Sequence, residues 1–364
     1  MSTPIEVLRK AGIEIIWFDS LGAKSMCIQV VTDNEFRIVI DPGAAEMQPS
    51  YPLPPEEKIR LRKLAIEKIA NACEKSRVLI ITHYHYDHHV LPSDPHIPDP
   101  RKMFLNKTII MKCPNKYINN SQWERARLFI EQLLKLVGED IRKYLTKPQE
   151  TEFEDPCTKL SIALSKSFGD YDERRRQLLQ EGKKWFTKLA SELWSRHDWV
   201  MEIELQDLKI LWGDSRKFVF GTCEIQILEP WFHGVEYDRT GWVTPLIIRN
   251  RGYTVFYTSD LMGPIIEDYA EFIASLRPDI VILDGPPTYL FPYMFNRINL
   301  QRAIDNAITI IKAKPRLIIY DHHLLRERKW RERVKPVFEE AQKSDVPVLT
   351  AAEVLGDKPL IDKL

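Results

Sequence analysis

Four side chains that can bind a metal ion fall within six residues of this sequence: His83, His85, Asp87 and His88. They follow residues 78–81, an apolar run rich in β-branched residues that predicts a buried strand ending at the cluster. His83 and His85 are two residues apart, so in an extended segment they project to the same side. Imidazoles and a carboxylate are ligands that a divalent metal such as zinc prefers. Because so many imidazoles would make a poor core, the spacing favours a metal site over a structural role.

Other acidic or metal-binding residues also stand where predicted strands end. They are Asp41, His233, Asp260, Asp284, and the pair His322 and His323. Strand ends on one edge of a sheet converge, and rigid elements hold ligands more accurately than loops. The recurrence therefore predicts one pre-formed cage.

Two of these carboxylates, Asp41 and Asp284, have alternative interpretations. Each could cap a turn, or it could orient a metal ligand without touching the metal, as carboxylates often do. Gly43, in Asp41-Pro42-Gly43, allows the backbone to come close to a neighbour.

The periodicity of apolar residues predicts a mixed α/β chain. Strands are expected at 13–18, 25–32, 36–40, 78–82, 108–112, 202–205, 210–212, 218–220, 223–228, 244–248, 253–257, 280–283, 316–320 and 346–349. Helices are expected at 56–73, 121–144, 173–195, 265–276, 300–313 and 324–342, with Pro336 kinking or restarting the last one.

Residues 91–200 do not continue the strand-rich pattern of the rest of the chain. A Pro-rich loop there leads to two long amphipathic helices. A capping-box pattern at 121–124 marks the start of the first helix, and the second carries an apolar, aromatic stripe. We predict one domain over residues 1–364, with 91–200 as a helical insertion that serves as a lid or cap. The basic runs 174–176 and 183–184 lie off the stripe and could be a solvated face or a phosphate-binding patch.

Composition excludes several classes of protein. Lys plus Arg equals Asp plus Glu, 52 each, so net charge gives no argument for a nucleic-acid partner. No apolar run is long enough for a membrane span, and no secretion signal is visible at the N-terminus, so we expect a cytoplasmic protein without a membrane partner. The five Cys are scattered and form no CxxC pair, which argues against a disulfide scaffold. Oligomeric state is left open.

The motif Thr82-His83-Tyr84-His85-Tyr86-Asp87-His88 resembles the T-H-x-H-x-D-H signature of the metallo-β-lactamase superfamily. His233, Asp260 and His322 are similar to its later His, its bridging Asp and its final His, and Asp41 to its early strand-end Asp. The similarity covers about residues 12–90 and 200–350. Within the superfamily the chain resembles an archaeal branch of predicted metal-dependent hydrolases.

The resemblance implies a four-layer αββα sandwich and a dinuclear metal centre. His83, His85 and His233 would bind one metal, Asp87, His88 and His322 the other, and Asp260 would bridge them. His323 is an alternative to His322; we prefer His322 as the ligand because its distance from the strand matches the family pattern.

Two divalent metals about 3.5–4 Å apart activate a water and polarise a substrate oxygen. Asp87 and Asp260 are the candidate catalytic residues, because either could orient that water as well as bind metal. Arg326, just after His322, is the candidate for binding a substrate phosphate or carboxylate. Imidazole and carboxylate ligands suit zinc first, with iron and manganese as alternatives.

The superfamily fold does not name a substrate. The basic runs and a resemblance to RNA-processing relatives favour a phosphodiester, with RNA as one candidate. The apolar stripe and zero net charge favour the alternative, a small-molecule ester, thioester or lactone. A metal-stabilised binding scaffold is the third hypothesis, and seven ligands argue against it, because structural zinc sites are closed by four.

Overall fold

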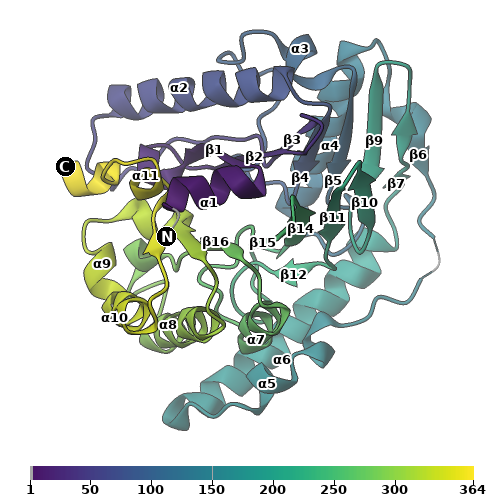
Figure 1. The fold of residues 1–364 in the computed structure, drawn as a ribbon. Coiled ribbons are helices and arrows are strands. Elements are labelled where there is room, and N and C mark those ends of the chain that lie inside the picture. The colour runs from purple at the N-terminus through teal and green to yellow at the C-terminus, as the bar shows by residue number, and fades with distance from the viewer. Residues whose placement is uncertain (1–2, 150) are drawn as a thin grey trace.

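The structure, a computed structural model, describes residues 3–149 and 151–364; residues 1, 2 and 150 of the predicted domain lie outside this range. Two seven-stranded sheets face each other, and helices cover their outer surfaces, with α2 (Pro55–Glu74) on one side and α7 (Glu267–Leu276) and α8 (Arg297–Lys312) on the other (Figure 1). The predicted αββα sandwich is confirmed.

The first sheet is built mostly from the N-terminal half of the chain. In spatial order it contains β1 (Ile13–Phe18), β2 (Met26–Val31), β3 (Arg37–Ile40), β4 (Val78–Ile81), β5 (Lys107–Met111), β9 (Leu208–Trp212) and β8 (Ile203–Glu204). From β3 to β9 the strands are parallel. The carboxyl ends of β3 and β4, which precede Asp41 and His83, therefore meet at one edge.

The second sheet continues from the C-terminal half. Its order is β10 (Lys217–Phe220), β11 (Cys223–Ile227), β14 (Leu246–Asn250), β15 (Tyr253–Tyr257), β16 (Ile280–Asp284), β17 (Leu317–Asp321) and β18 (Val348–Leu349). The last four are parallel, so Asp284 at the end of β16 lies at the same edge as Asp260 and His322, which follow β15 and β17. Two short pairs complete the strands: β12 (Trp231–Phe232) with β13 (Trp242–Val243), and β6 (Leu145–Thr146) with β7 (Trp199–Val200).

Side chains that alternate along the strands fill the space between the sheets. Ile38 and Ile40 of β3 and Ile80 of β4 are buried in the same cluster as Ile248 of β14 and Ile282 of β16. Their neighbours in sequence point outward and pack under the helices. Both faces of these strands are thus buried, which is why the sequence shows continuous β-branched runs rather than alternation.

The remaining helices are short or cover the edges of the sandwich. They are α1 (Pro4–Ala11), α3 (Pro100–Phe104), α4 (Asn120–Leu136), α5 (Ser161–Ser165), α6 (Asp172–Lys188), α9 (Trp330–Arg333), α10 (Lys335–Ser344) and α11 (Ala351–Val354). Within the described residues, no helix is both long and apolar enough to cross a membrane.

Several helix ends differ from the sequence prediction, among them both ends of α4. Helix α4 begins one residue before Ser121, and the side chain of Asn119 caps it by accepting a hydrogen bond from the Gln122 amide. The helix ends at Leu136 rather than near residue 144, because Gly138, at a φ of 75°, follows it. Pro336 lies in the first turn of α10, so it restarts a helix, one of the two outcomes that the sequence predicted.

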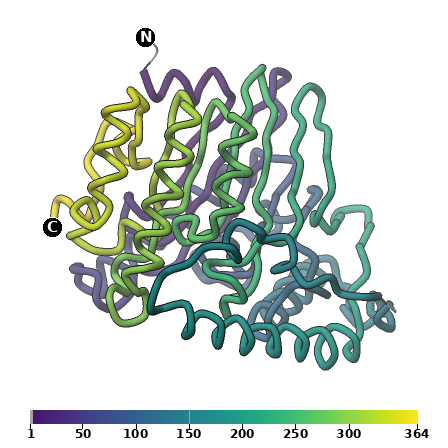
Figure 2. The backbone as a smooth tube through the Cα atoms, turned by 90° about the horizontal axis from the view of Figure 1, so that it is seen from below, coloured from purple at the N-terminus to yellow at the C-terminus, as the bar shows by residue number. Residues whose placement is uncertain are grey.

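Residues 91–200 divide into a part inside the sandwich and a part outside it. Strand β5 pairs with β4 and β9 within the first sheet, whereas α5 and α6 lie beyond the sheets (Figure 1). Viewed from below, α6 crosses the edge of the molecule opposite the N-terminus (Figure 2). Its stripe residue Phe186 is buried, as are Leu189 and Trp194 of the single π-helical turn that extends it. A lid or cap role for this part stays a prediction.

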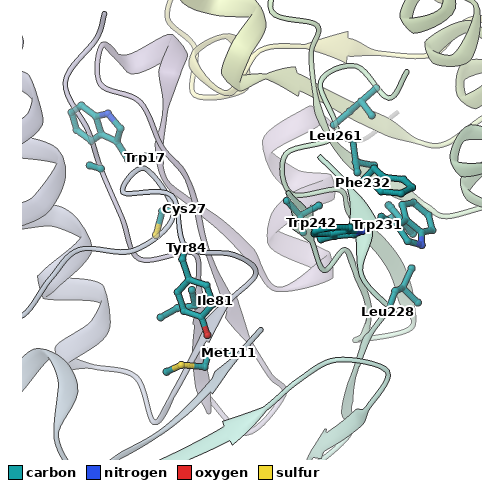
Figure 3. Packing of buried hydrophobic residues seen from close by; sticks show 14 of the residues in the cluster. Trp17, Cys27, Ile81, Tyr84, Met111, Leu228, Trp231, Phe232, Trp242 and Leu261 are labelled. Carbon is teal, nitrogen blue, oxygen red and sulfur yellow. The ribbon is translucent and has the colours of Figure 1, made fainter. Parts of the chain in front are cut away.

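Helix α6 is anchored on the loop between β12 and β13. A Cβ at Gly182 would lie 2.4 Å from the Cβ of Tyr237, so the helix backbone lies directly against this loop. The ring of Trp242 on β13 packs against Phe186 of α6 and against Phe232 of β12; Phe232 and Trp242 are both shown in Figure 3. Since His233 begins this loop, the external helix packs against a segment that carries a predicted ligand.

A buried ion-pair network adds a second anchor. Glu236 accepts hydrogen bonds from Arg175 of α6 and from Arg302 of α8, each at 2.7 Å, and Arg302 also pairs with Glu267 of α7. Burial favours the neutral form of Glu236, but Arg302 and Arg175 outweigh it and lower the pKa of the carboxyl. The network thus ties three helices to the β12–β13 loop.

We expect Glu236→Gln to lower the free energy of unfolding by about 3–5 kcal/mol, because it leaves the buried guanidinium of Arg175 without a counter-charge and Arg302 with Glu267 as its one remaining carboxylate partner. Thermal or denaturant unfolding measures the change. Glu224→Gln is the matched control: its more exposed carboxylate pairs with Lys217 and Arg249, and its loss should cost about 1 kcal/mol or less. Equal losses in the two variants would contradict a special role for the buried network.

Candidate metal centre

The carboxylate of Asp260, just after β15, lies at the centre of the strand-end residues. Its Oδ2 is 3.3 Å from Nε2 of His83 and 3.1 Å from Nε2 of His233. Its Oδ1 is 2.7 Å from Nε2 of His88 and 3.0 Å from Nε2 of His322. Each oxygen thus faces a different pair of imidazoles, which is the arrangement of a carboxylate that bridges two metal sites.

Two groups of potential ligand atoms, each within 4.8 Å of one another, share this carboxylate. One group is His83, His85, His233 and Asp260, and the other is Asp87, His88, Asp260 and His322. The structure brings together all seven ligands predicted from the sequence, in the grouping that the resemblance implied. Only His85 and Asp87 are half-buried, with the Asp87 side chain 13% exposed. The centre is therefore open on their side.

Buried polar atoms without a partner test whether these residues fit metal ions. Nε2 of His83 and Oδ1 of Asp260 have no well-formed hydrogen bond although both are buried. In addition, Nε2 of His88 and Nε2 of His322 are only 3.3 Å apart. Buried polar atoms are normally satisfied, and imidazole nitrogens with a carboxylate suit divalent transition metals. The residues therefore fit two such ions.

The electrostatics of the centre depend on burial and on the two buried carboxylates, Asp260 and Asp41. Burial is the main cause that lowers the pKa of His83, to about 4, so this imidazole is neutral and able to bind metal. Burial also disfavours charge on His88, but Asp260 and Asp41 outweigh it and raise the pKa of His88 to about 10. A metal ion at His88 would take the place of that proton.

Asp41, predicted as either a turn cap or an orienting residue, contacts three elements of the centre. Its Oδ2 lies 2.8 Å from Nδ1 of His88 and accepts hydrogen bonds from the Thr82 hydroxyl and the Tyr257 hydroxyl, while Oδ1 accepts from the Thr82 amide. With Nδ1 of His88 held, its Nε2 faces Asp260. These contacts favour the orienting role.

Three residues that end strands here adopt left-handed backbone angles, although none is glycine. The φ angles are 51° at Asp41, 53° at Ser259 and 62° at His322. Such conformations are uncommon, and they persist where the surroundings fix them, often at functional sites. Each one turns the chain sharply at the edge where the ligands converge.

Gly43 lies against the backbone of the histidine motif. A Cβ at this position would be 2.2 Å from the amide nitrogen of His89 and 2.5 Å from the carbonyl carbon of His88. The close backbone approach expected from the sequence is thus made to the segment that carries the ligands. Since both neighbouring atoms belong to the backbone, the segment could not avoid a side chain here without moving.

Asp19 is an orienting residue that sequence reasoning missed. It lies in the 3-10 helix η1 (Asp19–Leu21) after β1, where its Oδ1 is 2.8 Å from Nδ1 of His322 and accepts from the Ser25 amide. Burial raises the pKa of Asp19, but Arg326 and His322 lower it further, to about 2. The signal for finding it was present, because Asp19 directly follows a predicted strand, as Asp41 does.

Arg326, predicted to bind a substrate phosphate or carboxylate, has its guanidinium engaged by carboxylates of the protein itself. It lies at the end of the 3-10 helix η7 (His322–Arg326), is 5% exposed, and donates from Nε to Asp19 at 2.6 Å and from Nη2 to Asp87 at 3.2 Å. The buried carboxylate of Asp19 and the half-buried carboxylate of Asp87 thus engage the guanidinium, which holds Asp87 in position. A role in substrate binding stays a prediction.

The structure also distinguishes His323 from His322. Nδ1 of His323 lies 3.0 Å from Oδ1 of Asp284, and its ring packs 4.4 Å from that of His322. Asp284 therefore orients His323 and belongs to neither of the two ligand groups around Asp260. Asp284, His322 and His323 are themselves close enough to form a third group of potential ligands. Of the two histidines, His322 is the one that reaches Asp260.

A cavity of about 670 Å³ lies elsewhere and is lined by residues such as Tyr117, Trp231 and Phe272. None of the seven predicted ligands lines it. The metal centre, rather than this cavity, is where groups able to perform chemistry converge.

The αββα layers and the paired ligand groups at the strand ends define a protein of the metallo-β-lactamase fold. No protein-family model matches the chain. The chain is 30% identical over 343 residues to a UPF0282 protein of Korarchaeum cryptofilum, across 94% of this chain and 88% of the relative, and it belongs to the UPF0282 family. A UPF0282 protein of Methanopyrus kandleri is 29% identical over 345 residues, 93% of this chain and 92% of the relative.

Solved structures show a more distant similarity. The metallo-β-lactamase fold protein YhfI from Bacillus subtilis is 12% identical, with a TM-score of 0.41 and coverage of 93% of this chain and 95% of the other. Unliganded yeast PDE1 is 11% identical, with a TM-score of 0.38 and coverage of 93% and 96%.

We expect Asp41→Asn to weaken divalent metal binding by about 10- to 100-fold, the usual cost of losing a residue that orients a metal ligand. Competition against a chelator measures the affinity. Asp33→Asn, in an exposed turn, is the matched control and should leave the affinity unchanged. Wild-type affinity in Asp41→Asn would mean that Asp41 serves only as a turn cap.

Gly43→Ala should displace the His88–His89 backbone and lower both stability and metal content. Overpacking of this kind costs about 1–3 kcal/mol, and elemental analysis reports the metal. Gly138→Ala is the control: its Cβ meets nothing within 4 Å, but its φ of 75° carries a strain of its own. It should lose some stability and keep its metal. A Gly43→Ala protein with full metal content would contradict the close packing.

Proposed function

We propose that this chain is a metal-dependent hydrolase with a dinuclear centre that acts on a phosphodiester. The observation that carries the proposal is the position of Asp260, whose two oxygens face separate pairs of histidines. A structural zinc site is closed by four ligands, whereas seven residues converge here and one side is open. These features support catalysis rather than a purely structural role.

The proposed chemistry divides between metals and protein. When bound, two divalent ions lower the pKa of a bound water and polarise a substrate oxygen. Asp260 is fully buried, which suits a bridging ligand better than a group that exchanges protons with solvent. Asp87 lies on the open side, and its ion pair with Arg326 fixes its carboxylate. Asp87 is therefore our candidate for the residue that orients the attacking water.

The metals we propose are zinc first, with iron or manganese as alternatives, since imidazole and carboxylate ligands accept all three. A phosphodiester is favoured because a pair of ions can stabilise both the attacking and the leaving oxygen of an in-line displacement. The alternative is hydrolysis of a carboxylic ester, thioester or lactone, and the experiment must distinguish this activity from phosphodiester hydrolysis.

The test combines elemental analysis with turnover of bis-p-nitrophenyl phosphate and a panel of p-nitrophenyl esters. We expect about two metals per chain in the wild type, as in two-metal hydrolases. Asp260→Asn should hold fewer metals, because an amide nitrogen cannot be a ligand, and should lose phosphodiester turnover by about a hundredfold or more, the typical size of a positioned group's contribution.

Asp279→Asn is the control. It replaces a carboxylate that contacts Arg316 and the Thr254 amide at the other end of β15 and β16. If the protein hydrolyses only the esters, the proposed substrate is a small-molecule ester, thioester or lactone and not a phosphodiester. A wild type that retains no metal after reloading would overturn the proposal as a whole.

A further inference from the structure

Two cations near the open side of the metal centre have no carboxylate partner. The first is Lys24, in the turn between η1 and β2. Its backbone pairs with Ala45, and the next residue, Ser25, bonds to both Asp19 and the Gly43 carbonyl. Among residues 3–149 and 151–364, nothing forms an ion pair or hydrogen bond with its ammonium group. Lys24 is therefore held at the edge of the centre by its backbone, with its charge unused.

The contacts of its backbone and of Ser25 place Lys24 beside Asp19 and Gly43, and nearby charges act on its ammonium group. Half-burial is the main cause that lowers the pKa of Lys24, and Arg326 adds to the effect, while Asp87 and Asp19 oppose it. Arg326 pairs with both Asp19 and the half-buried ligand Asp87, so Lys24 lies among the charges next to that ligand. Because Arg326 is engaged by two carboxylates, Lys24 is the cation in this group that stays available to an incoming anion.

The second cation is Arg125 of α4. Its guanidinium carbon lies 4.8 Å from the ring centroid of Tyr86, the residue between the two half-buried ligands His85 and Asp87. Tyr86 is 39% exposed, and in the described part of the chain Arg125 forms no ion pair. A cation stacked on an exposed aromatic ring presents both a charge and a flat surface.

In the sheet order, the strand that follows Lys24 and the strand that precedes α4 lie on opposite sides of β4, which leads into the ligand motif. The motif follows β4; Lys24 precedes β2, two strands away on one side, and Arg125 belongs to α4, which follows β5 on the other side. The half-buried ligands His85 and Asp87 follow β4, which lies between these two strands. An anionic chain that crossed the centre would meet one cation before the metals and one after.

We propose that Lys24 and Arg125 bind the phosphates that flank the scissile one, so that the substrate is a nucleic-acid strand rather than an isolated phosphodiester. This inference rests on the proposed function, since it assumes that the scissile phosphate lies on the metals. Unpaired cations along a path attract successive phosphates of a single strand.

The salt dependence of binding tests this inference directly. The metal-loaded protein is titrated with a short single-stranded oligoadenylate whose phosphorothioate linkages resist hydrolysis, and anisotropy is followed at increasing salt. Each phosphate contact adds about 0.7 to the slope of log K against log salt for single strands. Lys24→Gln and Arg125→Gln should each lower the slope by about that amount, and the double variant by about twice as much.

Two further variants make the result specific. Lys24→Arg keeps the charge and should keep the slope. Lys63→Gln removes an exposed charge of α2 that pairs with Glu67, and it should leave the slope unchanged. With an unmodified strand, the two Gln variants should raise KM by about tenfold, which corresponds to about 1.4 kcal/mol of binding free energy, and change kcat much less.

Failure of this inference and failure of the proposed function are distinguishable. Unchanged slopes in both Gln variants overturn the roles of Lys24 and Arg125, even when bis-p-nitrophenyl phosphate, which has no flanking phosphate, is hydrolysed. Absence of that hydrolysis in the metal-loaded wild type overturns the proposed function, whatever the slopes are. A wild type that does not bind the strand at low salt overturns the inference alone.

Discussion

The buried carboxylate of Asp260 imposes the strongest physical demand on this structure. A charge with no exposure to water costs several kcal/mol unless partners compensate for it. The compensation comes from imidazoles that approach both oxygens, and burial acts against charge on each of these imidazoles. Metal ions resolve the conflict, because they supply positive charge while the histidines stay neutral. The centre is thus built to hold cations between one carboxylate and a shell of histidines.

That shell requires the ends of strands from both sheets to meet. His83 and His88 follow β4 of the first sheet, whereas Asp260 and His322 follow β15 and β17 of the second. Contacts between the two sheets hold these strand ends together. For example, the Tyr257 hydroxyl of the second sheet donates a hydrogen bond to Asp41 at the end of a strand of the first sheet. The orienting carboxylates of the first sheet therefore depend on the packing of the sandwich, and the geometry of the centre depends on the whole fold.

The sequence predicted the framework because its signals are local. Continuous β-branched runs such as 78–81 mark strands buried on both faces, and a histidine motif directly after one of them marks a ligand cluster. What it could not predict depends on contacts distant in sequence. Arginine side chains are usually exposed, but Arg326 has two partners, Asp19 and Asp87, that are 307 and 239 residues away along the chain. Nothing in its surroundings along the chain shows that its donors are already engaged.

The same limit explains the helical segment outside the sheets. Its amphipathic pattern predicts α6 well, but the pattern alone does not identify the surface that the helix covers. Gly182 and Arg175 fix that surface through Tyr237 and Glu236, both within a few residues of the ligand His233. A helix held by a buried ion-pair network and by backbone contact is coupled to the position of that ligand. Movement of α6 would therefore have to break the network, and through the β12–β13 loop it would reach the metal centre.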